Sequence, residues 1–161
     1  MTRYLIAGAA GMLGRDLQRA LAGRDVTALS RAELDIVDGD AVEAAVAAHD
    51  VILNAAAFTN VDDAEVNEAA AYSINARGVE NLAVAAARTG ARLVTVSTDY
   101  VFPGDKPEPY REDDPVGPIN VYGASKEGGE QAVRTANPRH VILRTAWVVS
   151  PHRSNFLRTM L

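Results

Sequence analysis

The chain has 161 residues, of which 48% are hydrophobic and 23% charged, so it is long enough to bury one core and fits a single domain. Its formal net charge of −5, with Lys and Arg scattered along the chain, argues against a binding surface for nucleic acid or an anionic membrane. The absence of cysteine excludes disulfides, thiolate metal sites and cysteine nucleophiles, and the three histidines are too dispersed for a metal cluster, so we expect no metal centre.

The start of the chain leads directly into a strand pattern, with no basic segment followed by an apolar stretch of signal length. No later apolar run is long enough to span a bilayer. We therefore expect a cytoplasmic protein that binds neither membranes nor nucleic acid.

Short apolar runs alternate with Ala-rich amphipathic stretches along the chain. The runs predict strands at Arg3–Ala7, Val26–Leu29, Val51–Asn54, Arg92–Ser97 and His140–Thr145. The stretches between them predict helices at Met12–Ala22, Asp40–Ala48, Glu68–Thr89 and Val121–Thr135. This alternation predicts an α/β fold, a doubly wound parallel sheet with helices on both faces.

Three glycines in seven residues follow the first predicted strand: Gly8, Gly11 and Gly14. The first can make the tight turn, the second can let the backbone approach a pyrophosphate, and the third can let the helix pack closely on the strand. A helix that opens at Met12 presents free N–H groups and its positive dipole end to phosphate oxygens. Glycines at such a turn can also be purely conformational, and the spacing is not the Gly-x-Gly-x-x-Gly of two-domain dehydrogenases. Their place on the first βα turn favours a dinucleotide site.

The second predicted strand ends at Ser30-Arg31. An acidic residue there would bind the ribose 2′-hydroxyl of NAD, whereas Ser and Arg can accept a 2′-phosphate. The pair therefore favours NADPH, with NADH possible. The alternative is that Arg31 only caps a surface loop.

The fourth predicted strand ends in Ser97 and Thr98, at the edge where open α/β sheets bind ligands. Either hydroxyl could hydrogen-bond a substrate carbonyl. Between Phe102 and Pro118 the chain then holds five of its seven prolines, which predicts a long loop of functional or mobile character.

Tyr122 and Lys126 stand four residues apart at the start of a predicted helix, and so on one face of it. A nearby Lys cation favours the phenolate, which would bring the Tyr122 pKa from about 10 toward a useful range. The pair can then protonate a carbonyl oxygen as hydride reaches its carbon. A lone Tyr-x-x-x-Lys is also common as a packed Tyr beside a solvated Lys. The last residues, Asn155 to Leu161, look like the opening turns of an amphipathic helix without a cap or stop signal.

Together these motifs resemble the extended short-chain dehydrogenase/reductases, and more narrowly the dTDP-4-dehydrorhamnose reductase family. The narrower resemblance covers nearly the whole chain in order. It is carried by LDIVD (34–38), NAAAFTNVDDAE (54–65), SINARGVENLA (73–83), VSTDYVFPG (96–104), PINVYGASKEGGE (118–130), LRTAWVVS (143–150) and NFLRTML (155–161).

The resemblance implies a Rossmann fold and a set of cofactor-binding residues. The pyrophosphate would lie on Gly8, Gly11, Met12, Leu13 and Gly14, the adenosine phosphate on Ser30 and Arg31, the adenine beside Asp35 and Ile36, and the ribose over Ala55, Ala56 and Ala57. It also implies the residues for chemistry and substrate: Tyr122 as proton donor, Lys126 on the nicotinamide ribose, Thr98 on the sugar carbonyl, Asp99 and Tyr100 on the substrate, and Trp147 near the sugar or the nucleotide.

The implied function is NADPH-dependent reduction of the C4 ketone of dTDP-4-dehydro-6-deoxy-L-mannose to dTDP-L-rhamnose, by a homodimer. Two alternatives stay open: another nucleotide-sugar reductase, epimerase or dehydratase on this scaffold, or a non-catalytic NADP-binding subunit similar to the β-subunit of methionine adenosyltransferase. Family members continue into a smaller C-terminal region that closes over the sugar. We therefore expect residues 1–161 to form the NAD(P)-binding domain.

Three further features of the sequence call for interpretation. Gly128-Gly129, inside a predicted helix, indicates close helix packing or a dimer interface. Asn75 is interpreted as a backbone partner near a helix kink, and the acidic run Asp62–Glu65 as a solvated helix entry.

Overall fold

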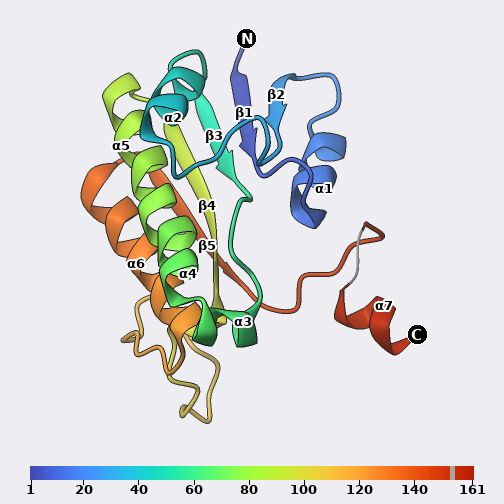
Figure 1. Cartoon of the computed structure of the whole chain (residues 1–161), viewed down its shortest axis with the longest axis vertical. Helices are drawn as coiled ribbons and strands as arrows, with labels where there is room; N and C mark the ends of the chain where they lie inside the picture. The colour runs from blue at the N-terminus through green and yellow to red at the C-terminus, as the bar shows by residue number, and fades with distance from the viewer. Residues whose placement is uncertain (153–154) are drawn as a thin grey trace.

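The computed structural model describes residues 1–152 and 155–161, and within them five parallel strands form one sheet (Figure 1). The strands are β1 (Arg3–Ala7), β2 (Asp25–Leu29), β3 (Val51–Asn54), β4 (Arg92–Thr98) and β5 (His140–Thr145). Their spatial order is β2-β1-β3-β4-β5, so the direction of winding reverses between β1 and β3. The doubly wound parallel sheet is confirmed, and its switch point lies where such sheets bind ligands.

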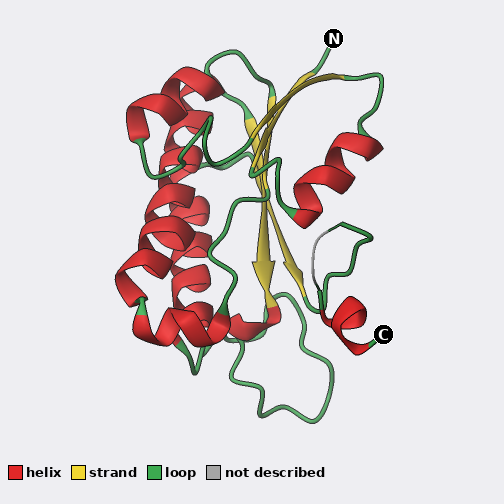
Figure 2. Cartoon of the chain, turned by 45° about the vertical axis from the view of Figure 1, so that its right-hand side comes forward, coloured by secondary structure: helices red, strands yellow, loops and turns green. Residues whose placement is uncertain are grey.

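Helices cover both faces of the sheet, as predicted (Figure 2). Helix α1 (Met12–Ala20) lies on the side of β1 and β2, while α2 (Gly39–Val46), α5 (Val79–Thr89) and α6 (Val121–Ala136) form a layer on the other side. The main core lies between this layer and the sheet, because the inward residues of the strands and helices meet there. It includes Leu5, Ile52, Leu93, Val42, Val46, Leu82, Ala86 and Val133.

The predicted helix over Glu68–Thr89 is divided in three. Helix α4 (Glu68–Tyr72) passes into a π-helical segment, η1 (Ser73–Gly78), before α5 begins. A further short helix, α3 (Val61–Val66), forms in the acidic run and is capped by Asn60. Asn75 lies in this π-helical segment, and its amide accepts a hydrogen bond from the Phe58 N–H and donates one to the Phe58 carbonyl.

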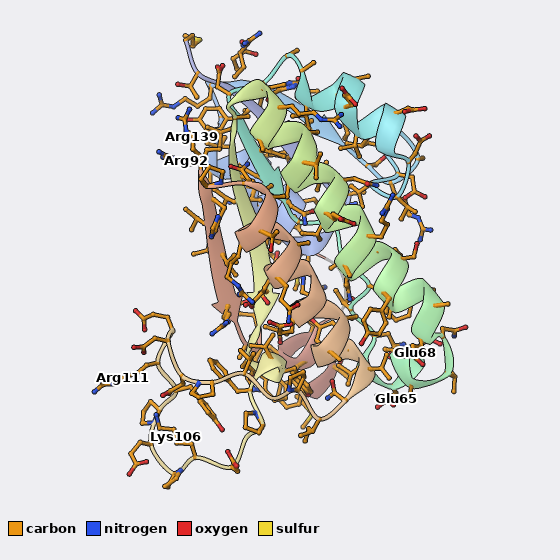
Figure 3. All side chains as sticks on the ribbon, turned by 90° about the vertical axis from the view of Figure 1, so that its left-hand side faces the viewer. Glu65, Glu68, Arg92, Lys106, Arg111 and Arg139 are labelled. Atoms are coloured by element: carbon orange, nitrogen blue, oxygen red, sulfur yellow. The ribbon has the colours of Figure 1, made fainter. Side chains whose placement is uncertain are left out.

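The proline-rich segment after η2 (Asp99–Val101) is a long loop, as predicted. Figure 3 shows Lys106 and Arg111 on this loop, away from the helical layer. The loop is packed on itself, since Tyr110 stacks on Phe102 with ring centroids 4.3 Å apart and Lys106 Nζ lies 2.6 Å from an Asp114 oxygen.

The last helix, α7 (Phe156–Met160), stands apart from the helical layer (Figure 1). The prediction that it lacks a cap is wrong, because the Asn155 side chain accepts a hydrogen bond from the Arg158 N–H. No helix of the described residues is long and apolar enough to cross a membrane.

Helix α6 packs with its backbone against two other segments. A side chain at Gly123 would overlap the carbonyl oxygen of Tyr100, and one at Gly129 would overlap the carbonyl oxygen of Asn75. The expected close packing at Gly128-Gly129 is therefore found, and it is a contact within the chain between α6 and η1.

A buried ion-pair cluster joins α6 to β5. The Glu130 side chain is almost fully buried and accepts hydrogen bonds from Arg144 at 2.9 and 2.7 Å and from Arg134 at 2.8 Å. Arg144 also donates to the Glu112 carbonyl and lies over the Phe102 ring, at 4.8 Å from its centroid. Burial by itself would raise the pKa of Glu130, but the hydrogen bonds from Arg144, the neighbouring Ser97 hydroxyl, the hydrogen bond from Arg134 and the charge of Arg144 outweigh it, and the pKa is lowered.

We expect Gly129→Ala to destabilise the protein by about 1–3 kcal/mol, because the added methyl must push α6 away from η1. The free energy of unfolding in urea measures this. Gly39→Ala is the matched control, since its new methyl would meet only the Asn81 side chain at ordinary contact distance. Equal stability of the two variants would show that α6 is not held by this contact.

We expect Glu130→Gln to cost about 3–5 kcal/mol at pH 7, because it leaves two arginines without their carboxylate. The lowered pKa means that the carboxylate contributes above its unfolded pKa, and that the contribution is lost as pH falls through the folded value. The difference between wild type and variant should thus shrink in acid. Exposed Glu43→Gln, which breaks the Arg88 pair, should change stability by less than about 1 kcal/mol. A pH-independent loss at Glu130 would contradict the role of its charge.

Candidate active site

The turn between β1 and α1 lies directly against the segment that follows β3. Gly8 has a φ of +83°, and a side chain there would come within 2.6 Å of the Ala56 nitrogen. A side chain at Gly14 would overlap the Gly8 carbonyl oxygen, where α1 packs on the turn. Contacts within the chain thus require glycine at both positions. This agrees with the tight turn expected at Gly8 and the close helix packing expected at Gly14.

The first turn of α1 is open to a ligand. Its N-cap is Gly11, which has no side chain to cap the helix, whereas side chains cap α2, α3 and α6. The unpaired N–H groups and the positive dipole end at Met12 and Leu13 are therefore available to an anion.

A cavity of about 200 Å³ lies at this edge of the sheet. It brings together most of the residues predicted for the cofactor, from three separate stretches of the chain. Its lining is Gly8, Ala10, Gly11, Arg31, Leu34, Asp35, Ile36, Ala55, Ala56, Ala57 and Ile74. Small apolar side chains, a close-packed glycine turn and one cation suit a dinucleotide, so the residues fit NADP.

The end of β2 differs in detail from the expectation. The Ser30 hydroxyl and N–H both donate to one Glu33 carboxylate oxygen, at 2.7 and 2.8 Å. Arg31 lines the cavity with its side chain 77% exposed, and its Nε lies 3.9 Å from an Asp35 oxygen. Ser30, which was predicted to bind a phosphate, thus donates its hydrogen bonds to a carboxylate instead.

The start of α6 is fixed by two side chains. Asn120 caps the helix by accepting a hydrogen bond from the Gly123 N–H at 2.7 Å, and Glu65 of α3 accepts one from the Val121 N–H at 2.9 Å. The interpretation of the acidic run as a solvated helix entry holds, since α3 begins there and Glu65 is exposed, and Glu65 in addition ties α3 to the helix that carries Tyr122.

Tyr122 lies beside the end of β4, with its ring edge-on to Tyr100 at a centroid distance of 5.6 Å. Burial raises the pKa of Tyr122, the neighbouring Thr98 hydroxyl acts in the opposite direction, and the charges of Asp99 and Tyr100 raise it further. The phenol is therefore protonated at neutral pH and available as a proton donor.

The prediction that Lys126 lowers the Tyr122 pKa is wrong for this structure. The Lys126 ammonium donates to the Val96 carbonyl at 2.7 Å, and it does not contribute to the shift at Tyr122. Burial lowers the pKa of Lys126 to about 8, partly offset by Glu130. The two side chains therefore share a face of α6 without acting on each other.

The residues predicted for the substrate fall into two groups. Thr98 is buried, donates to Asp99 at 3.0 Å and accepts from the Tyr100 N–H, so these three lie together beside Tyr122. Ser97, the alternative to Thr98, is also buried, and its hydroxyl has no hydrogen-bond partner among the described residues. Trp147 is instead 74% exposed and packs edge-on against Phe156 of α7.

Asn75 links the cofactor edge to the Tyr122 helix. Besides holding Phe58, its amide donates to the Ser125 hydroxyl at 3.0 Å, which in turn donates to the Tyr122 carbonyl at 2.7 Å. The interpretation of Asn75 as a backbone partner is confirmed. Ser125 and Glu130 were missed, and the only signal for Glu130 was its spacing of four residues from Lys126 and Arg134.

Comparison with known proteins bears on this site. The family model described as "RmlD substrate binding domain" matches residues 2–161. A dTDP-4-dehydrorhamnose reductase of Mycobacterium tuberculosis (strain ATCC 25618 / H37Rv) is 51% identical over 152 residues, which is 91% of this chain and 50% of that protein. A probable dTDP-4,6-dihydroxy-2-methyloxan-3-one 4-ketoreductase of Streptomyces antibioticus is 50% identical over 99% of this chain and 56% of its own length.

Among solved structures, the dTDP-4-dehydrorhamnose reductase of Bacillus anthracis str. Ames in complex with NADP is similar, with a TM-score of 0.96 and 43% identity. The match covers 99% of this chain and 59% of that one. The chain thus spans about half the length of the curated relatives it matches. Because the family model covers nearly every residue, the chain belongs to the RmlD substrate binding domain family.

Proposed function

We propose that the whole protein reduces the C4 ketone of dTDP-4-dehydro-6-deoxy-L-mannose to dTDP-L-rhamnose with NADPH. The observation that carries this proposal is a protonated, buried Tyr122 beside Thr98 at the carboxyl edge of the sheet, the same edge at which most of the predicted cofactor residues line one cavity. The names of the relatives from Mycobacterium and Bacillus, and the NADP in the latter, support it.

Residues 1–161 would form the NAD(P)-binding domain, and the sugar-binding region would lie in the remaining length that the relatives have. Gly8, Gly11 and the first turn of α1 would hold the pyrophosphate through backbone N–H groups. Ala55 to Ala57 would leave room for the ribose, and Arg31 would face the 2′-phosphate. When bound there, NADPH supplies the hydride.

The protein's own groups handle the proton. The Thr98 hydroxyl turns from Asp99 to the sugar carbonyl and orients it, and the Tyr122 hydroxyl gives its proton to that oxygen as the C–H bond forms. The ketone thereby becomes a secondary alcohol, and Tyr122 is left as a phenolate. Lys126, whose ammonium donates to the Val96 carbonyl on the same face of α6, would bind the nicotinamide ribose, and solvent returns the proton to Tyr122.

Two alternatives remain as competing functions. A related 4-ketoreductase, such as the name of the Streptomyces antibioticus relative describes, would use the same residues on another sugar. A non-catalytic NADP-binding subunit would not need Tyr122 and Lys126 together, and their retention favours an enzyme. The acidity and the absence of cysteine also lead us to propose a cytoplasmic location.

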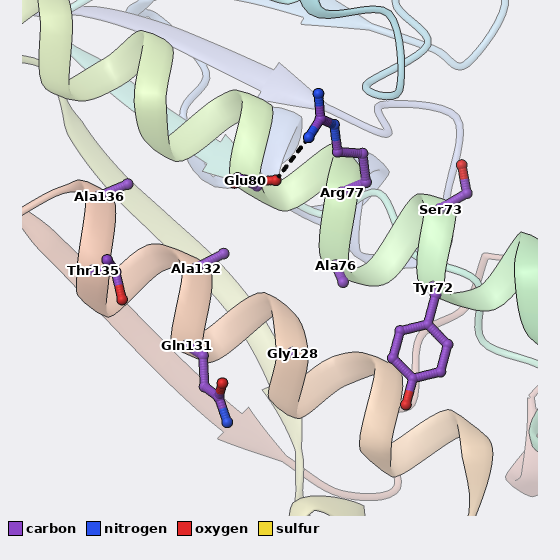
Figure 4. Close-up of a pocket in the computed structure, with 10 residues that line it drawn as sticks. All are labelled: Tyr72, Ser73, Ala76, Arg77, Glu80, Gly128, Gln131, Ala132, Thr135 and Ala136. Atoms are coloured by element: carbon purple, nitrogen blue, oxygen red, sulfur yellow. Dashed lines mark hydrogen bonds and ion pairs between the residues drawn. The ribbon is translucent and has the colours of Figure 1, made fainter.

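We propose further that the protein is a homodimer that covers the groove between α6 and the η1–α5 segment. This groove has a volume of about 590 Å³. Figure 4 shows Ala76, Ala132 and Ala136 along it, with Tyr72 at one end. Small side chains on two neighbouring helices allow a second pair of helices to approach closely.

For the reaction, we expect Tyr122→Phe in the full-length protein to keep NADPH affinity and to lower turnover by about 10²-fold or more, the usual contribution of a positioned acid. NADPH oxidation with the dTDP-keto sugar gives turnover, and titration of NADPH fluorescence gives affinity. Tyr4→Phe, in β1, is the control and should leave both unchanged. Unchanged turnover in Tyr122→Phe would remove this residue from the mechanism.

For the dimer, we expect Ala132→Arg to convert the full-length protein to monomers in sedimentation velocity, since the arginine fills the groove. Ala44→Arg, on the exposed surface of α2, should not change the sedimentation coefficient. A wild-type monomer, or a dimer that survives Ala132→Arg, would refute this interface.

A further inference from the structure

Glu33 is an exposed acid that belongs to none of the sequence motifs, yet it is folded back onto the end of β2. The N–H groups of Glu33 and Leu34 both donate to the Ser30 carbonyl, at 3.1 and 2.9 Å. This tight turn returns the Glu33 side chain to Ser30, where one carboxylate oxygen accepts both the hydroxyl and the N–H. The carboxylate thus occupies the two donors that Ser30 could offer to a ligand.

The charges around this end of the cavity are mixed. Of the residues that line the cavity, Arg31 is the cation and Asp35 the anion, and they lie 3.9 Å apart. Glu33 adds a second negative charge two residues from Arg31. The hydrogen bonds from Ser30 lower the pKa of Glu33, so its side chain is ionised at neutral pH.

A 2′-phosphate and a carboxylate require the same donors. The 2′-phosphate of NADPH would need hydrogen bonds from the Ser30 hydroxyl and the Arg31 guanidinium. At the Ser30 hydroxyl it would be repelled by the negative charge of Glu33, which already accepts from that hydroxyl. A ribose 2′-hydroxyl, as in NADH, brings no charge to this place. An acidic acceptor at the end of the second strand is the group that such a hydroxyl requires.

We propose that Glu33 is a specificity-determining residue, which holds Ser30 away from the 2′-phosphate. It thereby weakens NADPH binding and reduces the preference of the protein for NADPH over NADH. The inference rests on the proposed cofactor site. It adds to that site the residue that acts against binding of the 2′-phosphate by Ser30 and Arg31. Removing the Glu33 charge should therefore improve NADPH binding and leave NADH binding nearly unchanged.

The test is the dissociation constant of each cofactor for the full-length protein, from titration of nicotinamide fluorescence. Glu33→Gln keeps the size of the side chain and loses its charge. We expect it to tighten NADPH binding by about five- to tenfold and to change NADH binding by less than about twofold, as for two exposed charges at close range. High salt should reduce the gain for NADPH.

Two matched variants complete the test. Asp25→Asn removes an exposed charge at the opposite end of the same strand and should alter neither constant. Arg31→Ala should weaken NADPH more than NADH, and this loss should be larger in the Glu33→Gln background.

Equal changes for both cofactors in Glu33→Gln, or no change in either, would overturn the role of Glu33 while wild-type binding upholds the cofactor site. Wild-type protein that binds neither NADPH nor NADH would instead refute the proposed function itself.

Discussion

The backbone contact of α6 with its two neighbours is the constraint on which the site depends. Gly123 lies against the Tyr100 carbonyl and Gly129 against the Asn75 carbonyl, so the helix is fixed on both sides of the turn that carries Tyr122 and Lys126. At this depth Tyr122 reaches the end of β4, and Lys126 reaches the Val96 carbonyl. A helix held farther out by ordinary side chains would present the same two residues to solvent, without the burial that keeps Tyr122 protonated.

Polar groups buried under α6 connect this helix to the rest of the site. Asn75 holds the Phe58 backbone, which continues the Ala55–Ala57 floor of the cavity, and reaches Tyr122 through Ser125. On the other side Glu130 joins α6 to β5, and Arg144 extends the cluster to the proline-rich loop. The buried polar groups of both networks have hydrogen-bond partners. The networks therefore hold α6 in place without the free-energy cost of unpaired buried polar groups. Cofactor edge, proton donor and loop are thereby held as one unit.

Sequence alone predicted the architecture well, since alternation of apolar runs and amphipathic stretches depends on local periodicity. All five strands were predicted to within one residue at either end. The interruption at Ser73–Gly78 was not predicted as a π-helical segment, because local periodicity does not reveal contacts such as that of Asn75 with Phe58, 17 positions away. Motif residues could be named from spacing, but the pKa direction at Tyr122 could not, because burial depends on how α6 packs. The hydrogen bond from Ser30 to Glu33 was also missed, because it depends on the turn that brings the two side chains together.

In the proposed function, the packing of α6 would present Tyr122 as a proton donor to a ketone beside the bound dinucleotide. The most direct measurement of this role mixes the full-length protein and NADPH with dTDP-4-dehydro-6-deoxy-L-mannose, and follows NADPH absorbance together with the nucleotide sugar formed. We expect one NADPH to be consumed for each dTDP-L-rhamnose produced. NADPH that binds but is not consumed by this sugar would contradict the proposed reaction.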